Sequence, residues 1–161
     1  MKCGMNYYTY IAKELPRIIC EFFNVSDKRE DNFVAGLSMG GYGACKIAMR
    51  YPETFGGAGS LSGAFAIAEF SKVSGGFDWQ GAFGREFESP DELTGSYHDV
   101  FRIASDYKES GRAFPKLYMW CGTEDRLIDV NHKFHAHLDS LGVSHAYEYS
   151  EGDHSWKWWD M

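Results

Sequence analysis

A serine in a glycine-rich turn is the first group in this sequence that could do chemistry. Gly36-Leu37-Ser38-Met39-Gly40 has the pattern G-x-S-x-G and joins an apolar stretch, residues 32–37, to a small-residue stretch, residues 40–50. A serine on such a strained strand-to-helix turn projects its hydroxyl above the sheet edge, and the flanking glycines leave room for the backbone. The pattern therefore predicts that Ser38 is a nucleophile and that the Met39 N–H points at a developing oxyanion.

A serine hydroxyl needs a general base, and the base needs a carboxylate that orients it. Asp125 follows an apolar stretch at 116–121, and His154 follows another at 145–150. This gives the chain order Ser, Asp, His, which is typical of the G-x-S-x-G architecture. We therefore expect Asp125 and His154 to complete a triad with Ser38. The rival acids are Glu124 and Asp129, and Asp153 is interpreted as a helix cap.

The elements that must position these residues alternate between helix and strand. Helical spacing predicts a helix over residues 7–23, with an internal boundary at Pro16. Further helices are expected at 40–50, 99–109 and 131–141 and from 155, with strands at 32–37, 55–61, 116–121 and 145–150. Ser89-Pro90-Asp91-Glu92 resembles the start of another helix. The alternation predicts an α/β fold with a mostly parallel sheet and helices on both faces.

The whole chain, residues 1–161, is interpreted as one domain. Residues 64–113 form an insert between strands that we expect to lie over the site, but they carry no readable specificity pattern. The net charge of −7 argues against nucleic-acid binding, and no apolar run is long enough to cross a membrane. The first thirteen residues lack the apolar core of a signal peptide, which favours a cytoplasmic protein.

No metal or other cofactor is expected from the sequence. His132, His135 and His137 lie on one predicted helix, and we see no acidic or cysteine partner on that face. His98 and His145 are interpreted as surface residues. The candidate chemistry is therefore acyl transfer by side chains alone.

Three segments resemble the esterase family of α/β-hydrolases, which includes tributyrin esterase and acetyl- and feruloyl-esterase domains. They are GLSMGGYGACKIAMRYPETFGGAGSLSG, CGTED and GDHSWKWWD. The resemblance implies cofactor-free hydrolysis of short-acyl esters, including acetyl or feruloyl esters of carbohydrates. It assigns Ser38 as nucleophile, Asp125 as orienting acid and His154 as base, with Met39 as an oxyanion donor. Trp156, Phe65, Trp79 and Phe83 are candidates for lining a substrate pocket, with plain packing as the alternative.

The chain departs from this family ahead of the serine turn. Family members carry several strands there, whereas this sequence has room for one helix, so the chain resembles the C-terminal part of an esterase. We therefore expect an open strand edge at 32–37, covered by the N-terminal helix or by a second copy in a homo-oligomer. The loop that normally supplies a second oxyanion N–H is absent, which predicts weak or no ester hydrolysis. The alternatives are an S-formylglutathione hydrolase-type thioesterase and an inactive remnant or assembly module.

Overall fold

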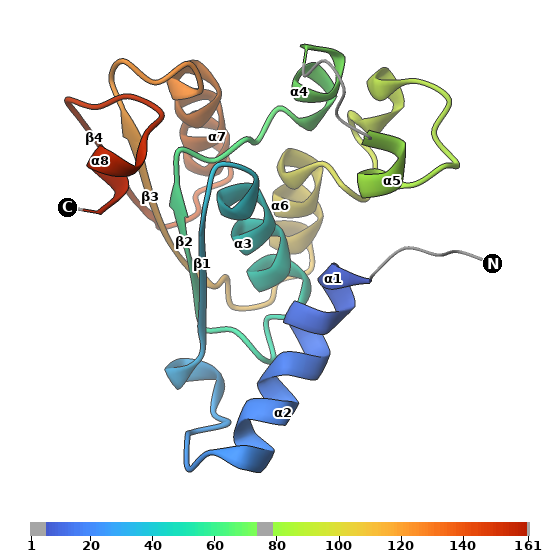
Figure 1. The fold of residues 1–161 in the computed structure, drawn as a ribbon, viewed down its shortest axis with the longest axis vertical. Coiled ribbons are helices and arrows are strands. Elements are labelled where there is room, and N and C mark those ends of the chain that lie inside the picture. Colours follow the sequence, from blue (N-terminus) through green and yellow to red (C-terminus); the bar gives the residue numbers. More distant parts are fainter. Residues whose placement is uncertain (1–5, 74–78, 161) are drawn as a thin grey trace.

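A parallel β-sheet forms the centre of the computed structural model, which describes residues 6–73 and 79–160 (Figure 1). Its four strands lie in chain order: β1 (Phe33–Leu37), β2 (Gly57–Leu61), β3 (Lys116–Gly122) and β4 (Ala146–Ser150). Leu37 is paired with Leu61, and Leu61 with Trp120. Because the strands are parallel, their carboxyl ends meet at one edge of the sheet, where Ser38 follows β1.

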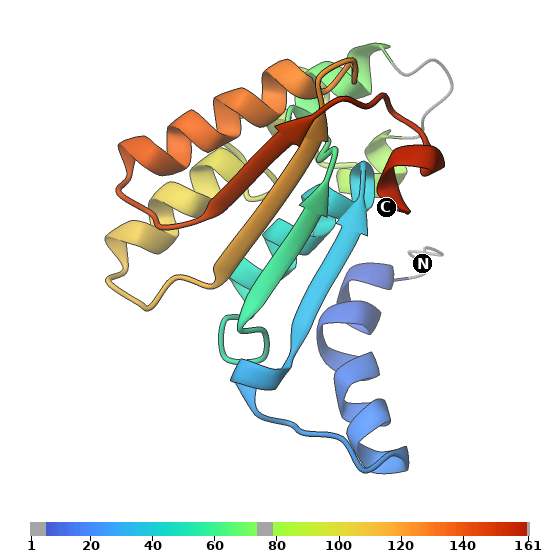
Figure 2. The same cartoon turned by 90° about the vertical axis from the view of Figure 1, so that its left-hand side faces the viewer.

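The helices between the strands lie mainly on one face of this sheet (Figures 1 and 2). They are α3 (Met39–Arg50), α4 (Ile67–Val73), α5 (Trp79–Phe83), α6 (Val100–Glu109) and α7 (Ile128–Ser140). Right-handed crossovers between strands in sequential order place every connecting helix on the same side. The expected partial α/β-hydrolase sheet is confirmed, but in the described residues the second face is largely uncovered, and the short α8 (Trp156–Trp159) lies beside its carboxyl end (Figure 2).

The core lies between the sheet and α3, α6 and α7. Alternate residues of β3 point into it, as Leu117, Met119 and Cys121 are buried whereas Lys116 and Tyr118 are exposed. The close approach of α3 to β2 depends on Gly41, since a Cβ there would lie 2.5 Å from the Ser60 hydroxyl oxygen. Gly43, in the same helix, plays no such part, because a Cβ there would meet nothing within 4 Å.

The N-terminal helix has the internal boundary that Pro16 predicts. It consists of α1 (Tyr7–Thr9), a π-helical turn at Tyr10–Glu14 and α2 (Leu15–Phe22). Proline has no N–H to donate, so the wider turn ends where Pro16 enters the first turn of α2. The helix packs on α3 through the Tyr8 and Tyr51 rings, whose centroids are 5.8 Å apart.

Several expectations about the insert are corrected. The helices α4 and α5 were not predicted, and residues 74–78 between them lie outside the described part of the chain. The segment after Ser89 is a 3₁₀ turn, Pro90–Leu93, that the Ser89 side chain does not cap. Asp99 instead caps α6, because its carboxylate accepts a hydrogen bond of 3.0 Å from the Phe101 N–H.

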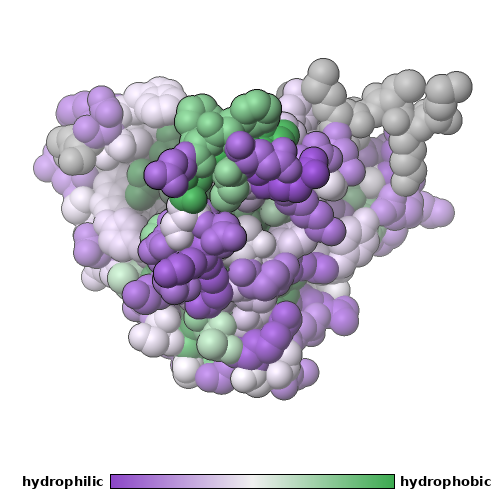
Figure 3. Space-filling model, turned by 90° about the horizontal axis from the view of Figure 1, so that it is seen from below, coloured by the Kyte–Doolittle hydropathy of each residue, from purple (hydrophilic) through white to green (hydrophobic). Residues whose placement is uncertain are grey.

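The outer edge of β1 is open, as the sequence predicts. In the described residues β1 pairs with β2 alone, and the N-terminal helix lies on that side of the molecule (Figure 2). Figure 3 shows apolar side chains gathered at the end of the molecule where α2 ends and β1 begins. The exposed residues of this apolar flank are Ile11, Ile19, Phe22, Phe23, Val25 and Phe33. Within the described residues, no helix has the length and apolar character needed to span a bilayer.

Candidate active site

Ser38 lies on a strained turn between β1 and α3. Its backbone has φ 54° and ψ −117°, a conformation that side-chain-bearing residues rarely adopt. The Ser38 N–H donates to the Leu61 carbonyl (2.9 Å), and its own carbonyl accepts from the N–H groups of Tyr42 and Ala64 (both 3.1 Å). These bonds hold the turn to β2, to α3 and to the start of the insert, and so fix where the hydroxyl projects.

The two glycines of the motif make different contributions to this turn. A Cβ at Gly36 would overlap the backbone of Gly40, so the chain can make the turn only if residue 36 lacks a side chain. A Cβ at Gly40 would meet nothing within 4 Å. The expectation that both glycines leave room for the backbone therefore holds for Gly36 and is wrong for Gly40.

Asp125 is buried at the carboxyl end of β3, with 2% of its surface exposed. One carboxylate oxygen, Oδ1, accepts from the Leu127 N–H at 2.8 Å, and the other, Oδ2, lies 2.8 Å from His154 Nδ1. The nearby Asn131 side chain donates to the carbonyls of Leu127 (2.8 Å) and Gly63 (3.0 Å). The Asp125 loop is thereby tied to the segment that follows β2.

His154 bridges the acid and the serine. Its Nε2 lies 3.0 Å from Ser38 Oγ, and its Nδ1 faces the Asp125 carboxylate. Because a carboxylate can only accept here, Nδ1 carries a proton and Nε2 has a lone pair for the hydroxyl proton in the neutral ring. The three side chains that the sequence singled out therefore form one hydrogen-bonded chain.

Close contact between the loops after β3 and β4 brings Asp125 and His154 together. The Thr123 N–H donates to the Ser150 carbonyl (2.8 Å), and the Glu124 N–H donates to the Gly152 carbonyl (2.9 Å). A Cβ at Gly122 would overlap the backbone of Gly152, so the two loops can approach this closely only without a side chain there.

Trp159 is a site residue that sequence reasoning missed. Its ring meets the His154 ring edge to face, with centroids 4.8 Å apart, and its N–H donates to Ser62 Oγ at 3.0 Å. Trp156, the expected wall of an acyl site, is 71% exposed and packs against Trp159 at 5.8 Å. Both indoles belong to the same short aromatic helix, α8. The sequence alone therefore does not indicate which of them contacts His154.

Other acids and thiols near the triad do not compete with it. Glu124 and Asp129, the rival acids, are both exposed. Asp153 does not cap α8, because its carboxylate accepts a hydrogen bond from the Ser155 hydroxyl. Burial and the nearby Asp125 carboxylate raise the pKa of the Cys121 thiol to about 12, so this thiol stays protonated and is a poor nucleophile.

The aromatic residues of the insert are packing residues in this structure. Phe65 is buried against Phe134, with ring centroids 4.4 Å apart, and Phe83 is buried against Tyr42. Trp79 is partly buried on the same core. Phe65 does line a cavity, but the triad residues are not part of the lining of that cavity.

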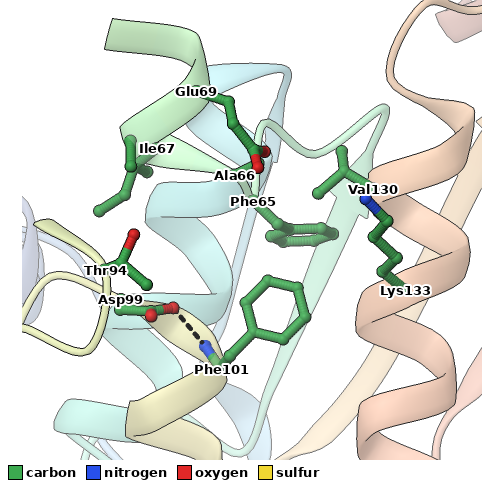
Figure 4. Close-up of a pocket in the computed structure, with 10 residues that line it drawn as sticks. Phe65, Ala66, Ile67, Glu69, Thr94, Asp99, Phe101, Val130 and Lys133 are labelled. Carbon is green, nitrogen blue, oxygen red and sulfur yellow. Dashed lines mark hydrogen bonds between the residues drawn. The ribbon is translucent and has the colours of Figure 1, made fainter. Parts of the chain in front are cut away.

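That cavity has a volume of about 150 Å³ and lies between α4, α6 and α7 (Figure 4). Phe65 and Phe101 present their rings to it, and Glu69 and Lys133 approach from α4 and α7. Ser38, Asp125 and His154 are not among its lining residues. Ala64, the neighbour of the lining residue Phe65, donates its N–H to the Ser38 carbonyl and so joins this region to the serine turn.

Two interpretations of other histidines are wrong. His98 is buried, and its Nδ1 lies 2.6 Å from the Lys46 ammonium nitrogen; burial, reinforced by Lys46, lowers the pKa of His98 to about 4. The His132–His137 face does carry an acidic partner, because Asp139 lies one turn beyond His135 with a nitrogen–oxygen distance of 3.4 Å. His145 is only partly exposed and contacts His135. The i, i+4 spacing of His135 and Asp139 could have revealed their contact from the sequence.

Comparisons with known proteins point to a family of esterases. Residues 2–161 match the family model described as "Putative esterase". The chain is 31% identical over 157 residues to an acetyl esterase of Caldicellulosiruptor saccharolyticus, which covers 94% of this chain and 58% of that protein.

Two solved structures from Staphylococcus aureus are also similar. The fluorophosphonate-binding serine hydrolase FphF superposes with a TM-score of 0.86 at 33% identity, over 98% of this chain and 60% of that one. The S-formylglutathione hydrolase FrmB has a TM-score of 0.74 at 31% identity, over 96% and 56% of the respective chains. This chain thus spans somewhat more than half the length of each relative. Because the family model matches residues 2–161 and the fold contains the expected serine turn, the chain belongs to the esterase family.

Proposed function

We propose that this chain carries the nucleophile, base and orienting acid of a serine carboxylesterase that acts on short-acyl esters. The hydrogen-bonded sequence Asp125, His154, Ser38 is the observation that carries the proposal. A serine paired with a neutral imidazole, itself held by a buried carboxylate, has the arrangement required for acyl transfer.

In the proposed reaction His154 Nε2 takes the Ser38 proton as Oγ attacks the ester carbonyl carbon. The carbonyl π electrons move to oxygen, and the Met39 N–H at the start of α3 stabilises that oxyanion. Collapse of the intermediate expels the alkoxide, which receives the proton from His154 Nε2. Water then repeats the cycle on the acyl-serine and releases the carboxylic acid.

The chain is similar to an acetyl esterase at 31% identity, which supports an acetyl ester as the first substrate to test. Similarity at 31% to an S-formylglutathione hydrolase supports thioester hydrolysis as the second candidate. Both reactions use the same three residues, because they differ only in whether oxygen or sulfur leaves. Feruloyl esters of carbohydrates remain a further prediction.

The expected rate is low. A second oxyanion donor normally follows an early strand, whereas in the described residues no strand precedes β1. Losing one such donor typically costs about 10²–10³ in rate. A chain with the triad and one N–H donor should hydrolyse esters measurably but slowly.

The test is hydrolysis of p-nitrophenyl acetate and of S-formylglutathione by the purified chain. We expect slow release of p-nitrophenol that Ser38→Ala abolishes and that Ser155→Ala, a control serine whose hydroxyl bonds to Asp153, leaves unchanged. Faster turnover of the thioester would favour the second candidate. Equal rates for the wild-type and Ser38→Ala proteins on both substrates would contradict the proposal and favour an inactive remnant or assembly module.

A further inference from the structure

Two histidines and an aspartate come together between α7 and β4. His135 and Asp139 lie one turn apart on α7, and His145 immediately precedes β4. Each offers one potential ligand atom, and these atoms all lie within 4.8 Å of one another. The cluster is at the end of the sheet where β4 begins, whereas the triad is at the end where the strands finish.

A backbone carbonyl fixes which nitrogen of His145 can bind a cation. His145 Nδ1 lies 2.8 Å from the Val143 carbonyl oxygen, which can only accept, so Nδ1 carries the proton. The lone pair of the neutral ring is then on Nε2. A histidine that donates one nitrogen to a carbonyl and offers the other to a metal is the usual arrangement of a ligand and its supporting group.

His135 faces that lone pair at short range. Its Nδ1 lies 2.7 Å from His145 Nε2, a separation at which two lone pairs repel unless a cation lies between them. A proton can serve, and so can a metal ion. The Asp139 carboxylate lies 3.4 Å from the second ring nitrogen of His135, Nε2, and adds a negative charge to the cluster.

We propose that His135, Asp139 and His145 bind Zn²⁺, with water completing a four-coordinate site. Two imidazoles and a carboxylate are a ligand set that zinc commonly takes. Tetrahedral bonds of about 2.0–2.1 Å need ligand atoms about 3.3 Å apart. The two imidazole nitrogens, now 2.7 Å apart, must therefore separate by about 0.6 Å, and the Asp139 carboxylate must move closer, since the three ligand atoms lie within 4.8 Å of one another. All three side chains are at least partly exposed and can make this adjustment by small rotations.

The surroundings hold the cluster in place. The Tyr147 ring packs against His135 with centroids 4.8 Å apart, and its hydroxyl lies 2.9 Å from His132 Nδ1. His132 is thus engaged elsewhere and is not a ligand. A bound ion would join α7 to β4 and stabilise their packing without reaching Ser38.

The experiment is a zinc titration of the purified chain by calorimetry, with thermal unfolding measured in parallel. We expect one Zn²⁺ per chain and a Tm increase of about 3–5 °C at a free zinc concentration tenfold above Kd. His145→Gln and Asp139→Asn should each weaken binding at least tenfold. His132→Gln, which changes a neighbouring histidine on the same helix, should bind zinc as the wild type does.

Several results would overturn the assignment. These are no stoichiometric binding at 100 µM zinc, unchanged affinity in His145→Gln, or an equal loss in His132→Gln. The readouts do not use ester hydrolysis, so a failure here leaves the proposed function untouched. Conversely, an inactive chain that binds zinc as predicted would refute the esterase and keep the zinc site.

Discussion

The carboxyl end of the sheet and the apolar flank beside β1 differ in how completely the chain covers its own side chains. At the carboxyl end, Asp125 is buried and both of its oxygens have partners within the chain. On the flank, Phe22 is 77% exposed and Phe33 is 62% exposed. The described residues therefore supply the contacts that align the candidate triad. They do not supply contacts that would cover the outer edge of β1.

This contrast has a physical basis in the topology. Ser38, Asp125 and His154 follow three parallel strands, so sheet pairing alone brings their loops to one edge. An edge strand leaves its outward N–H and C=O groups free to pair with another strand. The site and the open edge thus meet at β1, which presents Ser38 at one end and Phe33 at the other.

The largest expected effect concerns the orienting acid. Asp125→Asn keeps the shape of the side chain but removes the charge that fixes the His154 tautomer, so we expect the rate of ester hydrolysis to fall by about 10⁴. The measurement is p-nitrophenol release under identical conditions. Asp129→Asn, the control for an exposed neighbouring acid, should retain the wild-type rate, and an equal loss in both variants would contradict the assignment.

The second prediction compares the two regions directly. Phe134 is fully buried against Phe65, so Phe134→Ala should lower the free energy of unfolding by about 3–5 kcal/mol. Phe22→Ser on the apolar flank should change it by less than about 0.5 kcal/mol. Urea unfolding at a protein concentration where the chain is monomeric measures both. A large loss from Phe22→Ser would mean that the flank is part of the folded core.

A third test separates the two glycines of the serine turn. Gly36→Ala forces a methyl group against the Gly40 backbone and should cost about 1–3 kcal/mol in unfolding free energy. Gly40→Ala meets open space and lies within a helix, where alanine is favoured, so it should be neutral or slightly stabilising. Chemical denaturation of the two variants decides this, and equal losses would refute the distinction.

The open edge of β1 motivates a fourth prediction. We propose that a second copy of the chain pairs with residues 32–37 and covers part of the apolar flank. Sedimentation should then detect a dimer, and Phe33→Lys, which adds a charge at the edge, should weaken it by about tenfold or more. Lys116→Ala, a change to an exposed residue on β3, should not. A chain that sediments as a monomer at all accessible concentrations would contradict the dimer.

The fifth prediction is a pH dependence of stability from the buried Lys46–His98 pair. Burial, and then Lys46, lower the pKa of His98 from 6.5 to about 4, so in this interval the unfolded chain binds a proton that the folded chain excludes. Stability should therefore decrease as pH falls from 6.5 to 4. Thermal unfolding of His98→Gln should show a shallower decrease over that range, and parallel curves for the two proteins would rule out this contribution.

Much of the fold could be predicted because its signals are local. The strand and helix around Ser38 follow from an apolar run, a glycine pattern and a proline after residue 50, and the order of the triad follows from parallel pairing. The helices α4 and α5 could not be predicted, since their sequences lack a clear apolar period and depend on tertiary packing. Trp159 was missed for a related reason. The sequence Trp-Lys-Trp-Trp of α8 does not indicate which tryptophan packs against His154, because that contact depends on how α8 folds back onto the loop before it.

The proposed role of Ser38 as a nucleophile activated by His154 is tested most directly by mass-spectrometric mapping of a fluorophosphonate adduct on the purified chain. We expect one adduct, on Ser38, whose rate of formation falls sharply in His154→Ala and is unchanged in His132→Ala. An adduct on another residue, or labelling of Ser38 at the same rate without His154, would contradict it.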